Sequence, residues 1–280
     1  MSSATMRSEP TFTQKSWASL RTALIGCGLA EPLLRRGLLG LEETRRRLAL
    51  HHLPAGGRGL EIGPLHCPLP LPPGARARYV DHHTAGELRR LRDDAGAGIV
   101  DTDILTDGFT LGCIAAASQD FVVANHVLEH ATDALGTLEN WLRVLRPGGV
   151  LFVAVPIGAC CFDRGRAVTT PQHFLDDRRL SASGDSEAMR ERNRVHVEEH
   201  LDIAAPALAR GRGEVWTPLQ GEAREREIAR LLGADASQVH HHVFTPESFA
   251  ALLGLLGPAA RIERVARSSI EIVGIVSKRS

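Results

Sequence analysis

Polar residues that could hold an adenosine follow the short apolar stretches in the first half of the chain. Glu61 and Gly63 end one such stretch, and Asp81 with His82 ends the next. A strand, a tight turn and an acid about twenty residues later form the unit with which many α/β proteins bind a ribose. The spacing therefore predicts a nucleoside site in which the Asp81 carboxylate accepts hydrogen bonds from ribose hydroxyls.

The turn of this unit lacks most of the glycines of a dinucleotide-binding loop. It reads GPLHCP at 63–68, and its two prolines remove backbone N–H donors. A pyrophosphate needs the second and third glycines so that the backbone and the helix N-terminus can approach it. The loop therefore counts against an NAD-dependent oxidoreductase, which is the rival from another enzyme class.

Apolar periodicity places these residues at strand ends in an alternating α/β segment. Strands are predicted at 59–62, 77–81, 98–104, 120–124 and 150–155, helices at 85–91 and 133–145, and two or three further helices within 16–52. Thr245 as N-cap and Pro246 at the first helical position predict a helix through Leu256. Strands at 261–265 and 270–276 follow, and their short connection makes them antiparallel. The pattern predicts an α/β sheet of five parallel strands and a terminal hairpin, with helices on both faces.

The segment that begins with the fourth predicted strand resembles one enzyme class. This segment looks like the corresponding part of class I S-adenosylmethionine-dependent methyltransferases. It spans residues 120–156 and reads DFVVANHVLEHATDALGTLENWLRVLRPGGVLFVAVP, in which VLEH and RVLRPGG are the specific motifs. LEIGP at 60–64 stands where that family has its glycine loop, and EIGP, YVDH and HVFTPESF resemble a bacterial subgroup. The resemblance implies a Rossmann-like, mostly parallel seven-stranded sheet, methyl transfer, and S-adenosylmethionine as cofactor.

The same resemblance assigns residues to the cofactor. S-adenosylmethionine has no phosphate, and its anchor points are a ribose diol, an adenine, an ammonium and a carboxylate. Asp81 is expected to bind the ribose and Asp103 the adenine amino group, with Asp101 as a competitor. Glu61 orients the loop or meets the ammonium. The full expected set is Glu61, Gly63, Pro64, Asp81, His82, Asp103, Ile104, Asn125, His126 and His130.

His126, just after the fourth predicted strand, is the candidate catalytic residue. Methyl transfer is an in-line displacement that depends mainly on positioning. A hydroxyl acceptor must also lose a proton, and histidine is the side chain that most readily accepts one near neutral pH. The alternative is a hydrogen-bonded histidine beside the cofactor that transfers no proton.

Residues 158–243 interrupt the alternation and are rich in Arg, His, Asp and Glu. They follow the fifth strand, where loops cover the cleft of such a sheet, so we expect a substrate lid. The expected substrate-binding residues are Arg166, His173, His200 and His242. His196 and His200 have a spacing that could hold a metal, but with no fixed third ligand we predict no metal site. Solvated loops and ordinary packing histidines are the alternatives.

Composition narrows the range of partners. The chain has 33 basic and 33 acidic residues, a formal charge of zero and 4% aromatic residues. Nucleic-acid binders usually carry a basic face and stacking aromatics, so no nucleic-acid partner is expected. The sequence shows neither a secretory signal nor a run of about 18 apolar residues, which predicts a cytoplasmic protein without a membrane partner. A small-molecule acceptor and a homodimer are compatible with these features.

We therefore predict four segments: a tail with helices at 1–52, a cofactor-binding core at 53–157, the lid at 158–243, and a helix with a β-hairpin at 244–280 that completes the core. The predicted function is methyl transfer from S-adenosylmethionine to an oxygen or nitrogen of a small molecule, such as a sugar or a glycosylated or secondary metabolite. A nucleic-acid methyltransferase is the rival within the class. The alternative function is a degenerate methyltransferase fold that binds or regulates without catalysis, which the proline-filled loop favours.

Overall fold

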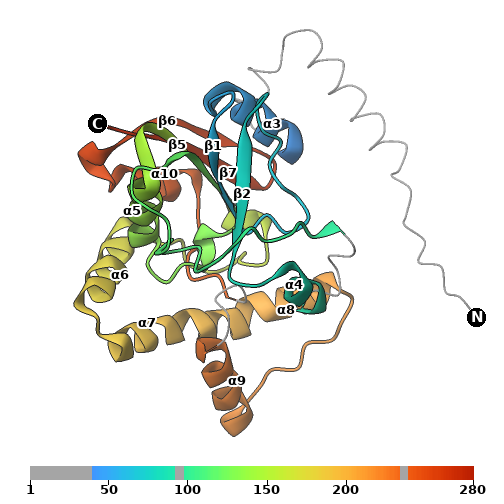
Figure 1. Cartoon of the computed structure of the whole chain (residues 1–280). Helices are drawn as coiled ribbons and strands as arrows, with labels where there is room; N and C mark the ends of the chain where they lie inside the picture. The colour runs from blue at the N-terminus through green and yellow to red at the C-terminus, as the bar shows by residue number, and fades with distance from the viewer. Residues whose placement is uncertain (1–39, 92–97, 234–238) are drawn as a thin grey trace, which may run out of the picture.

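A seven-stranded sheet forms the centre of the molecule (Figure 1). The computed structural model describes residues 40–91, 98–233 and 239–280. The strands are β1 (Arg58–Ile62), β2 (Arg76–Asp81), β3 (Ile104–Leu105), β4 (Gln119–Asn125), β5 (Leu145–Pro156), β6 (Ala260–Arg267) and β7 (Glu271–Lys278). They stand in the order β3-β2-β1-β4-β5-β7-β6, with β1 to β5 parallel and β7 antiparallel to both β5 and β6. The predicted fold class is confirmed.

Helices cover the sheet and fill the long connection after β5. The α-helices are α3 (Leu41–His52), α4 (Ala85–Leu91), α5 (Ala134–Val144), α6 (Pro171–Ser183), α7 (Ser186–Glu199), α8 (Ala205–Gly211), α9 (Gly221–Gly233) and α10 (Pro246–Gly254). A π turn, His200–Ala204, joins α7 to α8, and 3₁₀ turns occupy Leu128–His130, Gly158–Cys160 and Gly257–Ala259. The helices predicted before residue 40 lie outside the described residues. Within the described ranges, no helix is long and apolar enough to cross a membrane.

The strands divide their side chains between two apolar layers. In β4, Val122 and Ala124 point into the layer filled by α5 and α10, whereas Phe121 and Val123 point into the layer filled by α3. This alternation is the period of two expected of a strand that is buried on both faces. Helices therefore lie on both faces of the sheet, as predicted.

Side-chain caps fix where the core helices begin. Thr245 accepts a hydrogen bond from the Ser248 N–H, and Ser248 returns one to the Thr245 N–H, so that a capping box starts α10. Asp133 accepts from the Gly136 N–H at the start of α5. A cap of this kind stabilises a helix by about 1 kcal/mol. Both starts agree with the predicted ones to within a residue.

The third strand is much shorter than predicted, and the range 98–104 was wrong. Only Ile104–Leu105 pairs with β2. Upstream, the Val100 N–H donates to Leu65 O, and Ile99 packs beneath α4 instead of extending the sheet. The apolar pair at 99–100 therefore resembled a strand in sequence, but in the structure it supports the preceding helix and loop.

The segment between β5 and α10 forms a small helical layer of its own. Val197, Leu201, Ile228 and Leu231 of α7 to α9 make a separate apolar cluster, and Figure 1 shows these helices extending away from the sheet. Phe244 pairs with Ile157 as an isolated parallel bridge at the end of β5. The residues just before α10 therefore return to the carboxyl edge of the sheet.

Gly59 in β1 is required by the close approach of β4. A Cβ built on Gly59 would collide with the backbone carbonyl oxygen and the ring of Phe121. We expect Gly59→Ala to lower the free energy of unfolding by about 2 kcal/mol or more, because a backbone atom cannot move away as a flexible side chain can. Gly254→Ala, where a Cβ meets nothing within 4 Å, is the matched control. Urea denaturation checks both, and equal effects of the two substitutions would contradict the expectation.

Candidate functional site

Three polar side chains near the carboxyl edge of the sheet point to the same face. Glu61 on β1 pairs in register with Val123 on β4, so Asn125, two residues further on, shares its face. Glu271 begins β7 and shares the face of Val273, which lies in the α3 layer. Ligands of open α/β sheets bind beyond the carboxyl ends of the parallel strands. These side chains are therefore the first candidates for contact with a ligand.

Glu61 is buried with one carboxylate oxygen unused. Its Oε1 accepts a hydrogen bond from the Leu69 N–H at 2.8 Å, whereas Oε2 has no partner. Burial raises the pKa of Glu61 to about 7, although the Leu69 N–H and the nearby Arg45 charge pull it down. A carboxyl group in this state can orient the loop and still receive a cation at its second oxygen.

The Asn125 side-chain amide has no hydrogen-bond partner at all. Both Oδ1 and Nδ2 are buried, and neither meets a donor or acceptor. An unpaired buried amide costs on the order of 1–3 kcal/mol, so such groups usually have a ligand or water as partner. Together with Glu61 Oε2, this amide provides the mixed donor and acceptor set that the ammonium and carboxylate of S-adenosylmethionine require. The residues present therefore fit that cofactor.

The turn after β1 contains no helix. Gly63 has a φ of 60°, in the left-handed region that favours glycine, and its N–H donates to Val80 O. Pro64 follows, and its carbonyl oxygen accepts from the Cys67 N–H. No helix occurs between β1 and β2. The prolines at 64 and 68 are consistent with this, and no helix N-terminus points at a ligand from this turn.

At the end of β2, Asp81 is half-buried and pre-oriented. Its Oδ1 accepts a hydrogen bond from the His83 N–H at 3.0 Å, which fixes the carboxylate at the carboxyl end of the strand. His82 is exposed, and its Nδ1 lies 3.7 Å from the same oxygen. Both residues occupy the edge at which a ribose was expected, and their contact with it stays a prediction.

Asp103 does not stand at a strand end as predicted, because it precedes β3. It is exposed, and its Oδ2 accepts from the Tyr79 N–H at 2.8 Å, so the carboxylate caps a free donor of β2. Ile104 follows as the first residue of β3 and packs against the core. The competitor Asp101 is 92% exposed beside Arg89. The adenine contact of Asp103 remains a prediction.

His126 is held between two buried carboxylates. Its backbone has a φ of 56°, its Nε2 lies 3.0 Å from Glu271 Oε2, and its Nδ1 lies 3.6 Å from Glu129 Oε1. Glu271 is fully buried and also receives the Arg45 guanidinium, with Nη2 to Oε2 at 2.6 Å. The network Arg45–Glu271–His126 therefore fixes the imidazole and joins α3, β7 and the end of β4.

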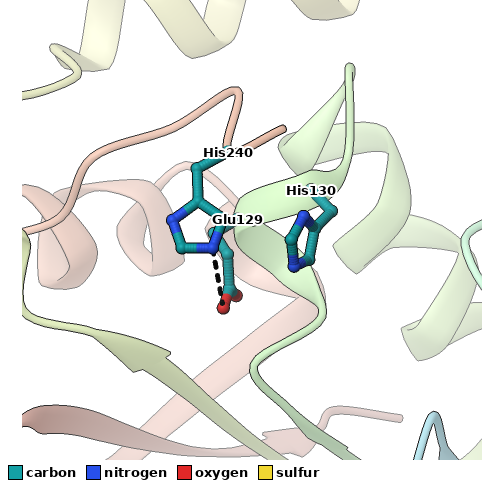
Figure 2. A group of neighbouring side chains, drawn as sticks. All are labelled: Glu129, His130 and His240. Carbon is teal, nitrogen blue, oxygen red and sulfur yellow. Dashed lines mark ion pairs between the residues drawn. The ribbon is translucent and has the colours of Figure 1, made fainter. Parts of the chain in front are cut away.

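Glu129, His130 and His240 form a compact group at the turn after β4 (Figure 2). Glu129 is fully buried, neither carboxylate oxygen has a hydrogen bond, and burial raises its pKa against the pull of His240 and His126. The Nε2 of His240 lies 4.0 Å from Glu129 Oε1, and its Nδ1 lies 2.6 Å from Asp163 Oδ2. The Nδ1 of His130 lies 3.0 Å from Val239 O. This group was not predicted as a unit.

Arg166, which was predicted to bind substrate, is buried in the structure. Its guanidinium is 1% exposed and forms ion pairs with Asp163 at 2.7 Å and Glu199 at 3.0 Å. It also donates to His240 O. These contacts make Arg166 a support of the histidine segment, and its contact with a substrate stays a prediction.

The other predicted substrate residues divide between two clusters. His242 is buried, and His173 is half-buried with its Nε2 3.2 Å from Asp177 Oδ2. His196 lies with them, and burial lowers its pKa to about 2. His200 is half-buried on the other side, near Arg166 and His240, and burial also lowers its pKa. The helix changes to a π turn at His200. His196 and His200 therefore contact different groups of residues.

A separate hollow of about 720 Å³ lies at the opposite edge of the sheet. It is bordered by His52, Gly148 and Lys278, and Gly148 and Val150 belong to the first half of β5. The amino ends of parallel strands are not where such sheets bind ligands. We therefore do not assign the cofactor to this hollow.

Comparison with known proteins identifies the central segment of the chain. Residues 82–153 match a family described as "Methyltransferase domain". No match is found among curated proteins. The matched segment contains β4, α5 and the turn with Glu129 and His130, whereas Glu61, Asp81 and Glu271 lie outside it.

Two solved structures illustrate how distant the similar chains are. A SAM-dependent methyltransferase from Aquifex aeolicus has 11% identity and a TM-score of 0.42, with 92% of this chain and 97% of that chain covered. A SAM-dependent methyltransferase from Methanosarcina mazei has 15% identity and a TM-score of 0.42, with 86% and 99% covered. Identities and TM-scores this low carry no argument about this chain. The likeness to methyltransferases therefore depends on the match of residues 82–153.

The buried ion pair of Arg45 should contribute strongly to stability. Arg45→Met would leave the fully buried Glu271 without its cation, and we expect the free energy of unfolding to fall by about 3 kcal/mol. Arg46→Met, on the same helix, removes an exposed pair with Glu43 and should cost less than about 1 kcal/mol. Urea denaturation of both variants measures the difference, and similar losses would contradict the role assigned to Glu271.

The raised pKa of Glu61 makes stability depend on pH. Between the unfolded pKa of 4.5 and the folded pKa of about 7, the folded protein keeps a proton that the unfolded chain has lost. Stability therefore falls as the pH rises through this window. Glu61→Gln keeps an oxygen for the Leu69 N–H but cannot ionise, so it should be more stable than the parent by up to about 3 kcal/mol at pH 8. Urea denaturation at pH 5 and pH 8 should show the gain shrinking at the lower pH; a constant gain would contradict the assignment.

Proposed function

We propose that this chain, an enzyme of the class I S-adenosylmethionine-dependent methyltransferases, transfers a methyl group to an oxygen or nitrogen of a small molecule. The observation that carries the proposal is the set of unpaired buried polar atoms at the carboxyl edge, Glu61 Oε2 and the Asn125 amide, beside the oriented Asp81. The bound cofactor supplies an electrophilic methyl group on a sulfonium. A sugar or a glycosylated or secondary metabolite is the first acceptor class to examine.

Residues from three strands would hold the cofactor. Asp81 at the end of β2 accepts hydrogen bonds from the ribose hydroxyls, with His82 beside it. Glu61 Oε2 and the Asn125 amide take the ammonium and carboxylate, and the left-handed turn at Gly63 lets the backbone approach them. The remaining members of the proposed set are Pro64, Asp103, Ile104, His126 and His130.

In this proposal, His126 accepts a proton from the acceptor group. Glu271 lies 3.0 Å from Nε2, so it fixes the ring and stabilises the imidazolium that forms when the other nitrogen is protonated. Nδ1 is then the atom that receives the proton, with the buried carboxyl of Glu129 next to it. A network of this kind keeps the proton close to the site while the methyl group moves.

The helical segment 158–243 serves as the substrate lid in this proposal. The segment before α10 joins the carboxyl edge through the Phe244–Ile157 bridge, and the His241 and His242 N–H groups both donate to Glu129 O. The lid is therefore anchored on the same turn that carries His126 and Glu129. A small acceptor that enters between lid and sheet would meet these groups.

Isothermal titration with S-adenosylmethionine and S-adenosylhomocysteine tests the cofactor contacts. Asp81→Asn should weaken binding at least about tenfold, because a hydrogen bond to a charged acceptor is worth about 1.5–3 kcal/mol. Glu222→Gln on α9 is the control, since that side chain is 93% exposed and belongs to no proposed site. NAD is the control ligand and should not bind.

The same preparation then decides between catalysis and the alternative function. Release of S-adenosylhomocysteine with a sugar or other small-molecule acceptor, lost in folded His126→Ala even at saturating S-adenosylmethionine, would support the proposal. Folded protein that binds neither sulfur nucleotide would refute it and would favour a degenerate fold that acts by binding or regulation. The helix-free, proline-rich turn after β1 is the feature that makes this alternative worth measuring.

A further inference from the structure

We propose that His173, Asp177, His196 and His242 form a site for a zinc-like divalent metal ion, which we call the lid metal site. The residues come from α6, α7 and the segment before α10. The sequence predicted no metal site, because the histidine pair visible in it had no third ligand. The structure supplies a carboxylate and two further imidazoles.

Two separations at His173 match those between neighbouring ligand atoms of a tetrahedral ion. The Nε2 of His173 lies 3.2 Å from Asp177 Oδ2 and 3.2 Å from the Nε2 of His196. Ligand atoms of His173, Asp177 and His242 all lie within 4.8 Å of one another. Bonds of 2.0–2.1 Å around a tetrahedral zinc ion put neighbouring ligand atoms about 3.3 Å apart. Small side-chain shifts would complete the coordination.

The hydrogen bonding around the lid metal site is incomplete without a ligand. His242 is 1% exposed, and neither of its ring nitrogens has a partner. Asp177 Oδ2 also lacks a hydrogen bond, although it lies close to His173. Buried imidazoles and carboxylates nearly always have partners. A shared metal ion would give a partner to Asp177 Oδ2 and to one ring nitrogen of His242.

The partners outside the four ligands also suit a metal site. Asp177 Oδ1 accepts a hydrogen bond from Arg192 Nε, and Arg192 Nη2 donates to His173 O. The contact with Arg192 orients the carboxylate and leaves Oδ2 for the ion. In metalloproteins, hydrogen bonds of this kind hold the metal-binding side chains in place. Three imidazoles and one carboxylate, all supplied by the protein, make a closed site of the structural type.

The group of Glu129, His130 and His240 is the competing location for a metal. Its His240 and Glu129 ligand atoms are 4.0 Å apart, which is wider than the separations at His173. His240 Nδ1 is also committed to Asp163, and Glu129 faces His126 as well. We therefore assign the ion to the lid metal site and use His130 as the control.

A metal there would fasten the lid to the methyltransferase core. His242 donates its backbone N–H to Glu129 O. A metal ion bound to His242 would therefore tie α6 and α7 to the turn after β4. The lid has only a small apolar cluster among its own helices. Binding energy at a structural site therefore becomes stability of the lid.

Metal analysis of the purified full chain tests the site. We expect close to one zinc per chain by mass spectrometry, and a cobalt-substituted protein with the strong visible absorption of tetrahedral Co²⁺. His173→Gln and Asp177→Asn should each reduce the metal content at least tenfold. His173 is half-buried and Asn keeps the volume of Asp, so both variants should fold; circular dichroism checks this. His130→Gln and His200→Gln are the controls and should retain the metal.

Three results would overturn the assignment. Full chain that binds neither zinc nor cobalt on direct titration has no metal site. Metal retained in folded His173→Gln and Asp177→Asn but lost in His130→Gln places the ion in the competing group. Removal of the metal by a chelator with no fall in Tm, where we expect about 5 °C or more, would exclude the structural role. These readouts do not depend on methyl transfer, so they separate this proposal from the proposed function.

Discussion

The buried carboxylate of Glu271 is the constraint on which the carboxyl edge of the sheet depends. It is fully buried, and it is tolerated there because the Arg45 guanidinium and the His126 imidazole both contact it. Removing a charged carboxylate from water costs several kcal/mol unless cations compensate. The contact between Glu271 and His126 also orients the His126 ring. Stability and the geometry of the candidate site therefore come from one network, and neither can be changed without affecting the other.

The sheet could be predicted because each strand is explained by its own residues. The apolar run of β4 and the Thr245–Pro246 cap of α10 are local patterns, and both elements appear in the structure where the sequence indicated them. The range predicted for the third strand was wrong because Ile99 packs against α4 instead of joining the sheet. Local patterns identify apolar residues, but they do not say which partner those residues will cover.

The candidate site was only partly visible in the sequence because its contacts are between distant residues. Glu61, Asp81 and His126 follow strands, so their position at one edge was predictable. Arg45 sits in a run of three arginines, and no spacing distinguishes it from its neighbours or links it to Glu271. Asp177 is four residues after His173, a spacing that could have suggested paired ligands on a helix. Only the fold brings His242 to them.

The turn after β1 has a consequence for which molecules the site can exclude. With no helix beginning there, the turn after β1 presents no helix N-terminus, with its N–H groups and positive dipole end, to a ligand. Nucleotides that depend on a phosphate for much of their binding energy would find nothing to replace the water around that charge. Cells contain such nucleotides in abundance, and they share the adenosine part with S-adenosylmethionine. In the proposed function, the proline-rich turn would therefore favour S-adenosylmethionine over nucleotides whose binding depends on a phosphate.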